Sequence, residues 1–328
     1  MKILILGGSK FVGRAIAEEA VANGHEVTIF NRGKLSPVKG CTSLVGDRRE
    51  ENGYAALDKL SFDTVIDTWT WEASVVKSAV EALKGRIKQY IFISTISVHD
   101  LSDKPSSYDE TSKLYELPAP NDYVRDKVGS EAELAASGVP ALLLRPGIIL
   151  GPYENPNGRL TWWLSRMNRG GDTIAPGPKD TELQFIDVRD LAKFAVHGAE
   201  ASLTGAYILT SPQNHITYEG LLEECNTVTG SKAKLCWLEP ELTQEAGLKN
   251  WVELPLRLPV SSTSIFNADT TKAKAAGLKI RPVSETVKDT WAWLQVTDVK
   301  PTIEAGMILG VDAEKEAAIL QKYFGNKA

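Results

Sequence analysis

A glycine-rich segment between a short apolar strand and an amphipathic helix constrains this chain most. Residues 2–6 (KILIL) predict a buried strand, and residues 12–23 carry apolar side chains at helical spacing. Glycines between them permit a tight turn and a close approach of backbone amides to a pyrophosphate, and the helix N-terminus adds partial positive charge. This context predicts a dinucleotide-binding loop, with a tight turn that binds nothing as the alternative. The predicted loop comprises Gly7, Gly8, Ser9, Lys10, Phe11, Val12 and Gly13.

Strands and helices continue to alternate along the first half of the chain. This order predicts an α/β fold, a doubly wound and mostly parallel Rossmann sheet with helices on both faces. Residues 184–202 predict a strand that leads into a helix, residues 206–210 predict another strand, and both strands are expected to return to the large sheet. The other predicted strands are 26–31, 44–45, 63–67, 89–94 and 140–146, and the other predicted helices are 73–84 and 123–136.

The pattern changes after Gly151, where Pro, Gly and Trp become frequent and the elements shorten. A length of 328 residues is typical of two domains. We therefore expect residues 1–155 and 184–212 to form the dinucleotide-binding Rossmann domain. Residues 156–183 and 213–328 are expected to form a smaller substrate-binding domain with a C-terminal tail.

Composition narrows the functional classes. Hydrophobic residues make up 43% and charged residues 24%, values typical of globular proteins. The net charge is −5, with basic residues mixed among acidic ones, so we expect no nucleic-acid partner. No apolar run is long enough to span a membrane. Cys41, Cys225 and Cys236 form no disulfide pattern and the four histidines have no metal-ligand spacing, so we expect a cytoplasmic protein without a metal site.

The end of the second predicted strand bears on the choice of cofactor. A carboxylate there would bind a ribose 2′-hydroxyl, but this chain has Asn31, followed by Arg32 and Lys34. Arg32 can pair with a 2′-phosphate, so NADP is favoured over NAD, unless Arg32 and Lys34 are ordinary solvated cations. Gly46 and Asp47 end the third strand, where a carboxylate can accept from an adenine amino group or simply form a turn.

Three side chains could carry the chemistry. Tyr123 and Lys127 are four residues apart on a predicted helix and so share a face. Thr95, beside Ser94, follows a strand at the sheet edge where doubly wound folds bind ligands. The Lys127 ammonium would favour the ionised phenol of Tyr123, which would exchange a proton with a carbonyl or hydroxyl oxygen held by Thr95. Lys127 could also hold the nicotinamide ribose. A half-buried helix aromatic is the alternative for Tyr123.

In combination these motifs resemble the extended short-chain dehydrogenases/reductases, the NAD-dependent epimerase/dehydratase family, and within it a branch whose loop reads GGTxFxG. The resemblance covers roughly residues 1–295. It implies that Thr95 is the active hydroxyl and that Pro146 and Gly147 lie beside the nicotinamide. Two departures are Lys10 at a glycine position and His99 where many relatives carry Tyr. The matching segments are GGSKFVG, FNRGK, GD, ISTISV, YVRDK, LRPGIILGP and QFIDVRDLA.

Several other residues could contact a substrate, and most of them have a structural alternative. Trp69 and Trp71 follow the fourth strand and should lie near the cofactor edge, and His99 begins a loop or shapes the substrate pocket. The polar loop 100–122 is a lid or a surface excursion. Three arginines bind a nucleotide-sugar diphosphate or form an ordinary helix face. These arginines are Arg159, Arg166 and Arg169.

The sequence therefore predicts an NAD(P)-dependent oxidoreductase or epimerase that transfers hydride between nicotinamide and a small alcohol or carbonyl compound, with Tyr123 as general acid/base. A nucleotide-sugar epimerase or dehydratase that retains its cofactor is one alternative. An RNA-binding or regulatory protein on the same scaffold is another, which the acidic charge and the intact set of Thr95, Tyr123 and Lys127 disfavour. The expected partner is a small-molecule substrate, and a homodimer is compatible with the sequence.

Overall fold

The structure, a computed structural model, describes residues 1–300 and 309–325. These residues fall into two compact units. The first unit comprises Met1–Ile149, Phe185–Ser211 and Asn267–Ile280, and the second comprises Leu150–Gln184, Pro212–Phe266 and the described part of Arg281–Ala328. The sequence predicts residues 267–280 in the second domain, but the structure places them in the first unit. Ala273 and Leu278 explain the difference, since both are buried in the core under the large sheet.

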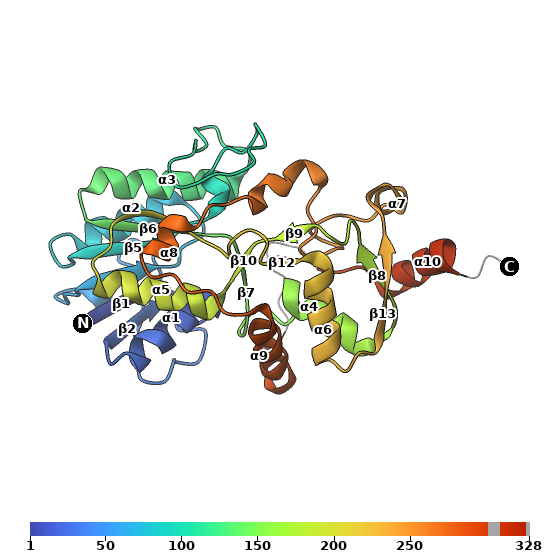
Figure 1. Cartoon of the computed structure of the whole chain (residues 1–328). Coiled ribbons are helices and arrows are strands. Elements are labelled where there is room, and N and C mark those ends of the chain that lie inside the picture. Colours follow the sequence, from blue (N-terminus) through green and yellow to red (C-terminus); the bar gives the residue numbers. More distant parts are fainter. Residues whose placement is uncertain (301–308, 326–328) are drawn as a thin grey trace. The chain divides into compact units, whose positions relative to one another are not determined.

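A seven-stranded sheet in the order β11-β6-β5-β4-β1-β2-β3 forms the centre of the first unit (Figure 1). Every pairing within this sheet is parallel, which confirms the predicted doubly wound α/β fold. The strands are β1 (Lys2–Leu6), β2 (Glu26–Asn31), β3 (Thr42–Val45), β4 (Thr64–Asp67), β5 (Gln89–Ile93), β6 (Ala141–Pro146) and β11 (Gly205–Leu209).

Helices cover both faces of this sheet. Figure 1 shows α1 and α5 on one face and α2 and α3 on the other. Each pair buries a row of apolar side chains against the strands, because central parallel strands are apolar on both sides. The helices are α1 (Phe11–Ala22), α2 (Ala73–Leu83), α3 (Asp122–Ser137), α5 (Val188–Glu200) and the short α8 (Thr271–Ala275), with 3₁₀ turns η1 (Ala55–Leu57) and η2 (Ile96–Val98).

The two strands predicted to return to the sheet differ in outcome. The second, β11, pairs with β6 at the edge of the sheet, as expected. The first, β10 (Phe185–Asp187), instead forms a separate two-stranded sheet with β7 (Ile148–Leu150), so that prediction is wrong. The cause is local. Asp187 N-caps α5 by accepting from the Arg189 amide, so the chain enters the helix after only three strand residues.

The second unit is built from shorter elements around a small apolar core that includes Ile174, Leu238 and Ile319. β8 pairs with β13 in parallel, and β9 pairs with β12 antiparallel. Among the described residues no helix is both long and apolar enough to span a membrane. The elements are α4 (Arg159–Arg169), β8 (Gly171–Pro176), β9 (Glu182–Leu183), β12 (Ile216–Thr217), α6 (Tyr218–Val228), β13 (Ala233–Leu238), α7 (Pro240–Glu245), η3 (Val260–Phe266), α9 (Val283–Val296) and α10 (Ala313–Phe324).

The order of strands places the site. β1 pairs with β2 on one side and with β4 on the other, so the strand order reverses where the chain passes from β3 back to β4. Such a switch point opens a crevice at the carboxyl ends of the strands, where doubly wound folds bind ligands. The glycine loop follows β1 at this point.

Candidate active site

The glycine loop has the close packing that a phosphate-binding turn needs. Gly7 follows β1 with φ +117°, and a Cβ there would lie 2.2 Å from the Thr68 Oγ1. A Cβ on Gly13 would lie 2.6 Å from the Gly8 amide nitrogen, so only glycine lets α1 approach the loop this closely. Lys10 provides no side-chain cap for α1, and the first turn has no acidic residue. The N-terminus of α1 therefore suits an anion.

Asn31 fastens the end of β2 to this loop. Its Nδ2 donates to the Gly7 carbonyl oxygen at 3.3 Å and to the Ser9 Oγ at 2.7 Å. Its Oδ1 accepts from the Gly33 amide at 2.7 Å. The amide side chain thus braces the turn, a role that the sequence did not predict.

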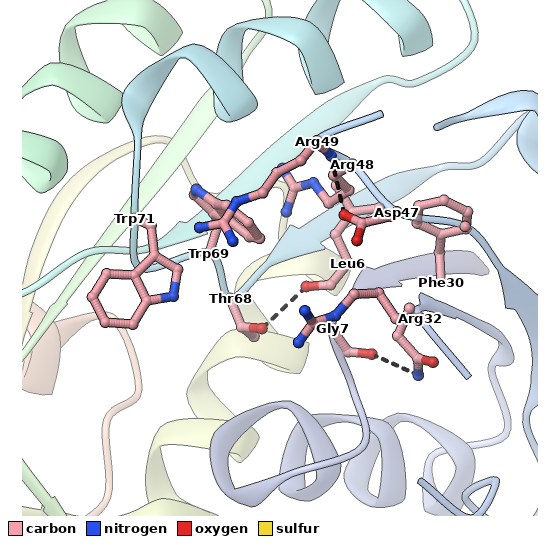
Figure 2. Close-up of a pocket in the computed structure, with 12 residues that line it drawn as sticks. Leu6, Gly7, Phe30, Arg32, Asp47, Arg48, Arg49, Thr68, Trp69 and Trp71 are labelled. Carbon is pink, nitrogen blue, oxygen red and sulfur yellow. Dashed lines mark hydrogen bonds between the residues drawn. The ribbon is translucent and has the colours of Figure 1, made fainter. Parts of the chain in front are cut away.

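A pocket of about 200 Å³ lies at the carboxyl ends of β1, β2 and β4, and we call it the strand-end pocket (Figure 2). It brings together five residues predicted to bind cofactor, as well as Trp69 and Trp71, which were expected near this edge. The five are Gly7, Asn31, Arg32, Gly46 and Asp47. The remaining lining residues are Leu6, Phe30, Arg48, Arg49 and Thr68. The loop residues from Gly8 to Gly13, Lys34, Pro146 and Gly147 are not among the twelve residues that line it.

The strand-end pocket carries cations in its wall. Arg32 points toward the pocket in Figure 2 and forms no ion pair with the residues that the structure describes. Arg49 forms an exposed pair with Glu72, both distances being 3.1 Å. One Asp47 oxygen accepts from the Arg49 amide at 3.1 Å. Arg32 is therefore the wall cation most available to an added phosphate.

Arg48, one of the lining residues, forms a buried ion pair in this wall. Its two terminal nitrogens donate to the two Asp67 oxygens at 2.7 Å each, and Asp67 is fully buried. Asp67 also accepts from the Tyr90 hydroxyl and, at 2.9 Å, from the Trp69 amide. Burial alone would lower the pKa of Arg48, but the Asp67 carboxylate outweighs it and raises that pKa. No sequence spacing links Arg48 to Asp67, so sequence reasoning missed the pair.

Lys127 is buried beneath the edge of the sheet, with a relative exposure of 3%. Its Nζ donates to the Trp69 and Ile93 carbonyl oxygens, both at 2.6 Å, and lies 4.6 Å from the centroid of the Phe92 ring. Burial lowers the pKa of Lys127 to about 7, although the Asp67 and Glu131 carboxylates oppose that change. A lysine with this pKa can change its charge at neutral pH, as functional lysines often do.

Tyr123 and Thr95 differ in exposure. Tyr123 lies in the first turn of α3, which Asn121 N-caps, and its relative exposure is 38%. Thr95 is buried and caps η2, because its Oγ1 accepts from the Ser97 amide and donates to the Ser97 hydroxyl, both at 3.2 Å. Ser94 donates to the Glu131 Oε1 at 2.5 Å and so serves the core. Tyr123 and Lys127 stand one helical turn apart on α3, as the spacing predicts.

His99 and Gly147 complete the predicted set. His99 is buried, with Nδ1 2.9 Å from the Ile96 carbonyl oxygen and Nε2 3.2 Å from an Arg145 nitrogen. Burial lowers the pKa of His99 to about 4. This histidine therefore organises the core beside η2. Pro146 ends β6, and the Gly147 amide donates to the Leu209 carbonyl oxygen at 3.0 Å.

Loop 100–122 and the arginines of α4, which could have contacted a substrate, make structural contacts within their own units. Loop 100–122 is anchored midway by Tyr108, which is buried and exchanges backbone hydrogen bonds with residues 267 and 269. In the second unit, Arg166 is buried, and its Nε donates to the two Glu316 carboxylate oxygens at 2.8 and 2.9 Å. Arg166 therefore belongs to the core of that unit rather than to a diphosphate site. Arg169 lies 3.9 Å from the same carboxylate.

Comparisons with known proteins agree with the predicted resemblance. The model of the NAD dependent epimerase/dehydratase family matches residues 52–207. The chain is 29% identical over 247 residues to the chloroplast stem-loop binding protein of 41 kDa b of Arabidopsis thaliana. The alignment covers 70% of this chain and 63% of that protein. It thus spans less than two thirds of that relative's length.

Two further proteins extend the comparison. The chain is 24% identical over 290 residues to UDP-N-acetyl-alpha-D-glucosaminuronate decarboxylase of Bacillus cytotoxicus, covering 79% of this chain and 88% of that one. The structure of Thermus thermophilus UDP-glucose 4-epimerase in complex with NAD has a TM-score of 0.67 at 19% identity, covering 90% of this chain and all of that one. The family model thus matches the predicted resemblance over these residues, and the predicted fold is confirmed.

Proposed function

We propose, from the match of residues 52–207 to the model of the NAD dependent epimerase/dehydratase family, that this chain is an enzyme that binds a nicotinamide dinucleotide and acts on a small alcohol or carbonyl compound. The relatives named as a decarboxylase and an epimerase support this class of chemistry. The observation that carries the proposal is the strand-end pocket, which stands at the switch point of the sheet beside the glycine loop.

The residues present fit such a cofactor. The uncapped N-terminus of α1 and the loop amides would bind the pyrophosphate, and the apolar and arginine-bearing wall of the pocket would bind the adenosine end. Arg32 would pair with a 2′-phosphate, so NADP is the favoured cofactor and NAD the second. When bound, the nicotinamide supplies or accepts a hydride.

Proton transfer is assigned to Tyr123. Its exposed phenol would give a proton to, or take one from, the substrate oxygen, and the Lys127 ammonium one turn along α3 would stabilise the ionised phenol. Thr95 would turn its hydroxyl from Ser97 to the same oxygen and fix its position. Lys127 would exchange a carbonyl partner for a ribose hydroxyl, and Pro146 and Gly147 would border the nicotinamide.

One experiment separates a reductase from an epimerase or dehydratase. NADPH and NADH oxidation would be screened against ketones and nucleotide sugars, and released cofactor would be identified by mass spectrometry. Net oxidation of NADPH identifies a reductase. Turnover of a nucleotide sugar with a retained cofactor identifies an epimerase or dehydratase. A chain that binds neither cofactor refutes the proposal.

The stem-loop binding relative favours a second candidate, an RNA-binding protein on the same scaffold. The net charge of −5 opposes it, because RNA binding rests on neutralised phosphates. A stem-loop RNA titrated at two salt concentrations tests it. Binding that weakens steeply with salt would support RNA recognition, and its absence at low salt would remove this candidate.

A further inference from the structure

The buried Arg48–Asp67 pair links the strand-end pocket to Lys127 through a short series of contacts. Arg48 lines the pocket, and its guanidinium carbon lies 4.9 Å from the centroid of the Trp69 ring. Figure 2 shows Arg48 and Trp69 side by side in the wall. Asp67 accepts from the Trp69 amide at 2.9 Å, while the Trp69 carbonyl accepts from the Lys127 Nζ at 2.6 Å. Trp69 thus links the Asp67 carboxylate to the Lys127 Nζ through its backbone amide and carbonyl groups.

The cluster around Asp67 is fully hydrogen-bonded. Tyr90 donates to Asp67, and Tyr54 accepts from the Arg48 Nε at 3.1 Å. A buried ion pair is weak evidence for stability, because the cost of removing two charges from water offsets their attraction. Its position between a pocket wall and a buried lysine suggests another use.

Resting on the function proposed above, we propose that Asp67, held by Arg48, is a positioning residue: it fixes residues 67–69 so that one wall closes the pocket and one carbonyl holds Lys127. Asp67 thereby couples the site of the adenosine end to the catalytic end. Arg48 acts through Asp67, and neither residue is assigned contact with the reacting atoms.

Electrostatics supports the same arrangement. Lys127 has only carbonyl oxygens as hydrogen-bond partners among the described residues, so its charge depends on more distant carboxylates. Asp67 from β4 is the stronger of the two that favour the ammonium, and Glu131 from α3 is the other. Glu131 is itself paired with Arg145 of β6 at 2.7 Å, and Asp67 with Arg48. The buried phenol of Tyr90 from β5 also contacts Asp67.

The test compares the wild type with the double variant Arg48→Met/Asp67→Asn, which removes both buried charges and leaves no unpaired ion. NADPH affinity is measured by titration without substrate. The ionisation of Lys127 is measured by NMR titration of its side-chain ε-methylene resonance over a series of pH values, with Lys127→Met used to assign the resonance. We expect the NADPH Kd to rise about tenfold or more, the scale of one lost charge-assisted interaction. We also expect Lys127 to titrate below its wild-type pKa of about 7.

Asp63→Asn is the matched control, because it removes a carboxylate from the segment just before the same strand, where Asp63 contacts Lys88. It should change neither measurement. The milder variant Arg48→Lys keeps a cation but loses the two-pronged contact with Asp67, so it should shift both measurements in the same direction by less. It keeps the test decisive should the double variant not fold.

Two results would overturn the inference. One is a folded double variant with wild-type NADPH affinity and wild-type titration of Lys127. The other is an unfolded double variant together with an Arg48→Lys protein that matches the wild type in both measurements. Lys127→Met separates this failure from failure of the proposed function. If Lys127→Met leaves NADPH binding unchanged, the role of the lysine in that function is wrong.

Discussion

Arg32 and Lys127 are two cations assigned to opposite ends of one cofactor, and their surroundings differ sharply. Arg32 lies in the wall of the strand-end pocket without an ion pair in the described chain. Lys127 is buried on two carbonyl oxygens, and burial lowers its pKa to about 7. The exposed cation should act by direct contact and affect one cofactor selectively. The buried cation should act through its ionisation and depend on pH.

The largest effect on turnover is expected from replacing Tyr123. Tyr123→Phe should lower turnover by about 10²–10⁴-fold, because the phenol is the assigned proton donor. NADPH affinity should stay nearly unchanged, since the cofactor is assigned to the glycine loop and the pocket. Steady-state kinetics and cofactor titration measure both. Tyr115→Phe is the control, and a Tyr123→Phe enzyme with wild-type turnover would refute the assignment.

The buried Lys127 should make the free energy of unfolding depend on pH. Unfolded Lys127 titrates near 10.5 and the folded residue near 7, so between these values the unfolded chain holds a proton that the folded chain has released. The free energy of unfolding should therefore rise with pH in this window and be lowest, as far as this group is concerned, below pH 7.

Comparison with Lys127→Met isolates this effect. The wild type should gain roughly 2–4 kcal/mol relative to the variant between pH 7 and 10. Urea unfolding at several pH values measures it. A difference between the two proteins that stays constant with pH would show that Lys127 is not buried as described.

The exposed cation should act on one cofactor. Arg32→Ala should weaken NADPH roughly 10–150-fold, corresponding to about 1.5–3 kcal/mol, and leave NADH nearly unchanged. Lys39→Ala is the control from the segment that follows, because Lys39 is exposed and does not line the pocket. Equal weakening of both cofactors, or a wild type that prefers NADH, would make Arg32 an ordinary surface cation.

Asn31→Asp sharpens the same comparison. A carboxylate would repel a 2′-phosphate and favour a 2′-hydroxyl, which swings the preference toward NADH. It would also lose the amide donors to the Gly7 carbonyl and the Ser9 hydroxyl, so both cofactors should weaken, NADPH more strongly. Titration of both cofactors measures this; stronger binding of NADPH would contradict it.

His99, beside the proposed catalytic segment, should affect the pH dependence of stability rather than cofactor binding. Its pKa is about 6.5 in the unfolded chain and about 4 in the folded one. As the pH falls from 6.5 to 4, mainly the unfolded chain takes up this proton, so the free energy of unfolding should fall by about 2–3 kcal/mol. His99→Gln should lose less over the same range. Equal acid sensitivity of the two proteins would contradict this.

The sequence predicted the parallel sheet and the glycine loop because both follow from local patterns. Alternation of apolar strands and helices is read within ten or twenty residues, and Gly7 and Gly13 are needed at particular points of one turn. The family resemblance added Pro146 and Gly147. Residues after each strand end, such as Asn31 and Asp47, could then be assigned to one edge.

The parts that sequence reasoning missed depend on side chains that meet only after folding. Arg48 and Asp67 come from different segments and are both buried, and an isolated charged residue is usually read as exposed. Arg166 was expected at a diphosphate site or on an ordinary helix face for the same reason, although it is buried against Glu316. The sequence predicted β10 in the large sheet. The structure pairs it elsewhere because the strand is only three residues long and ends at Asp187, which caps α5, and so short a strand has no pattern that identifies its partner.

Calorimetric titration of NADPH and NADH into the wild-type chain tests the central claim most directly. The account predicts saturable binding of both cofactors, one per chain, with NADPH bound at least tenfold more tightly because Arg32 lies in the pocket wall. Absence of saturable binding for either cofactor would contradict the assignment of the strand-end pocket and the glycine loop.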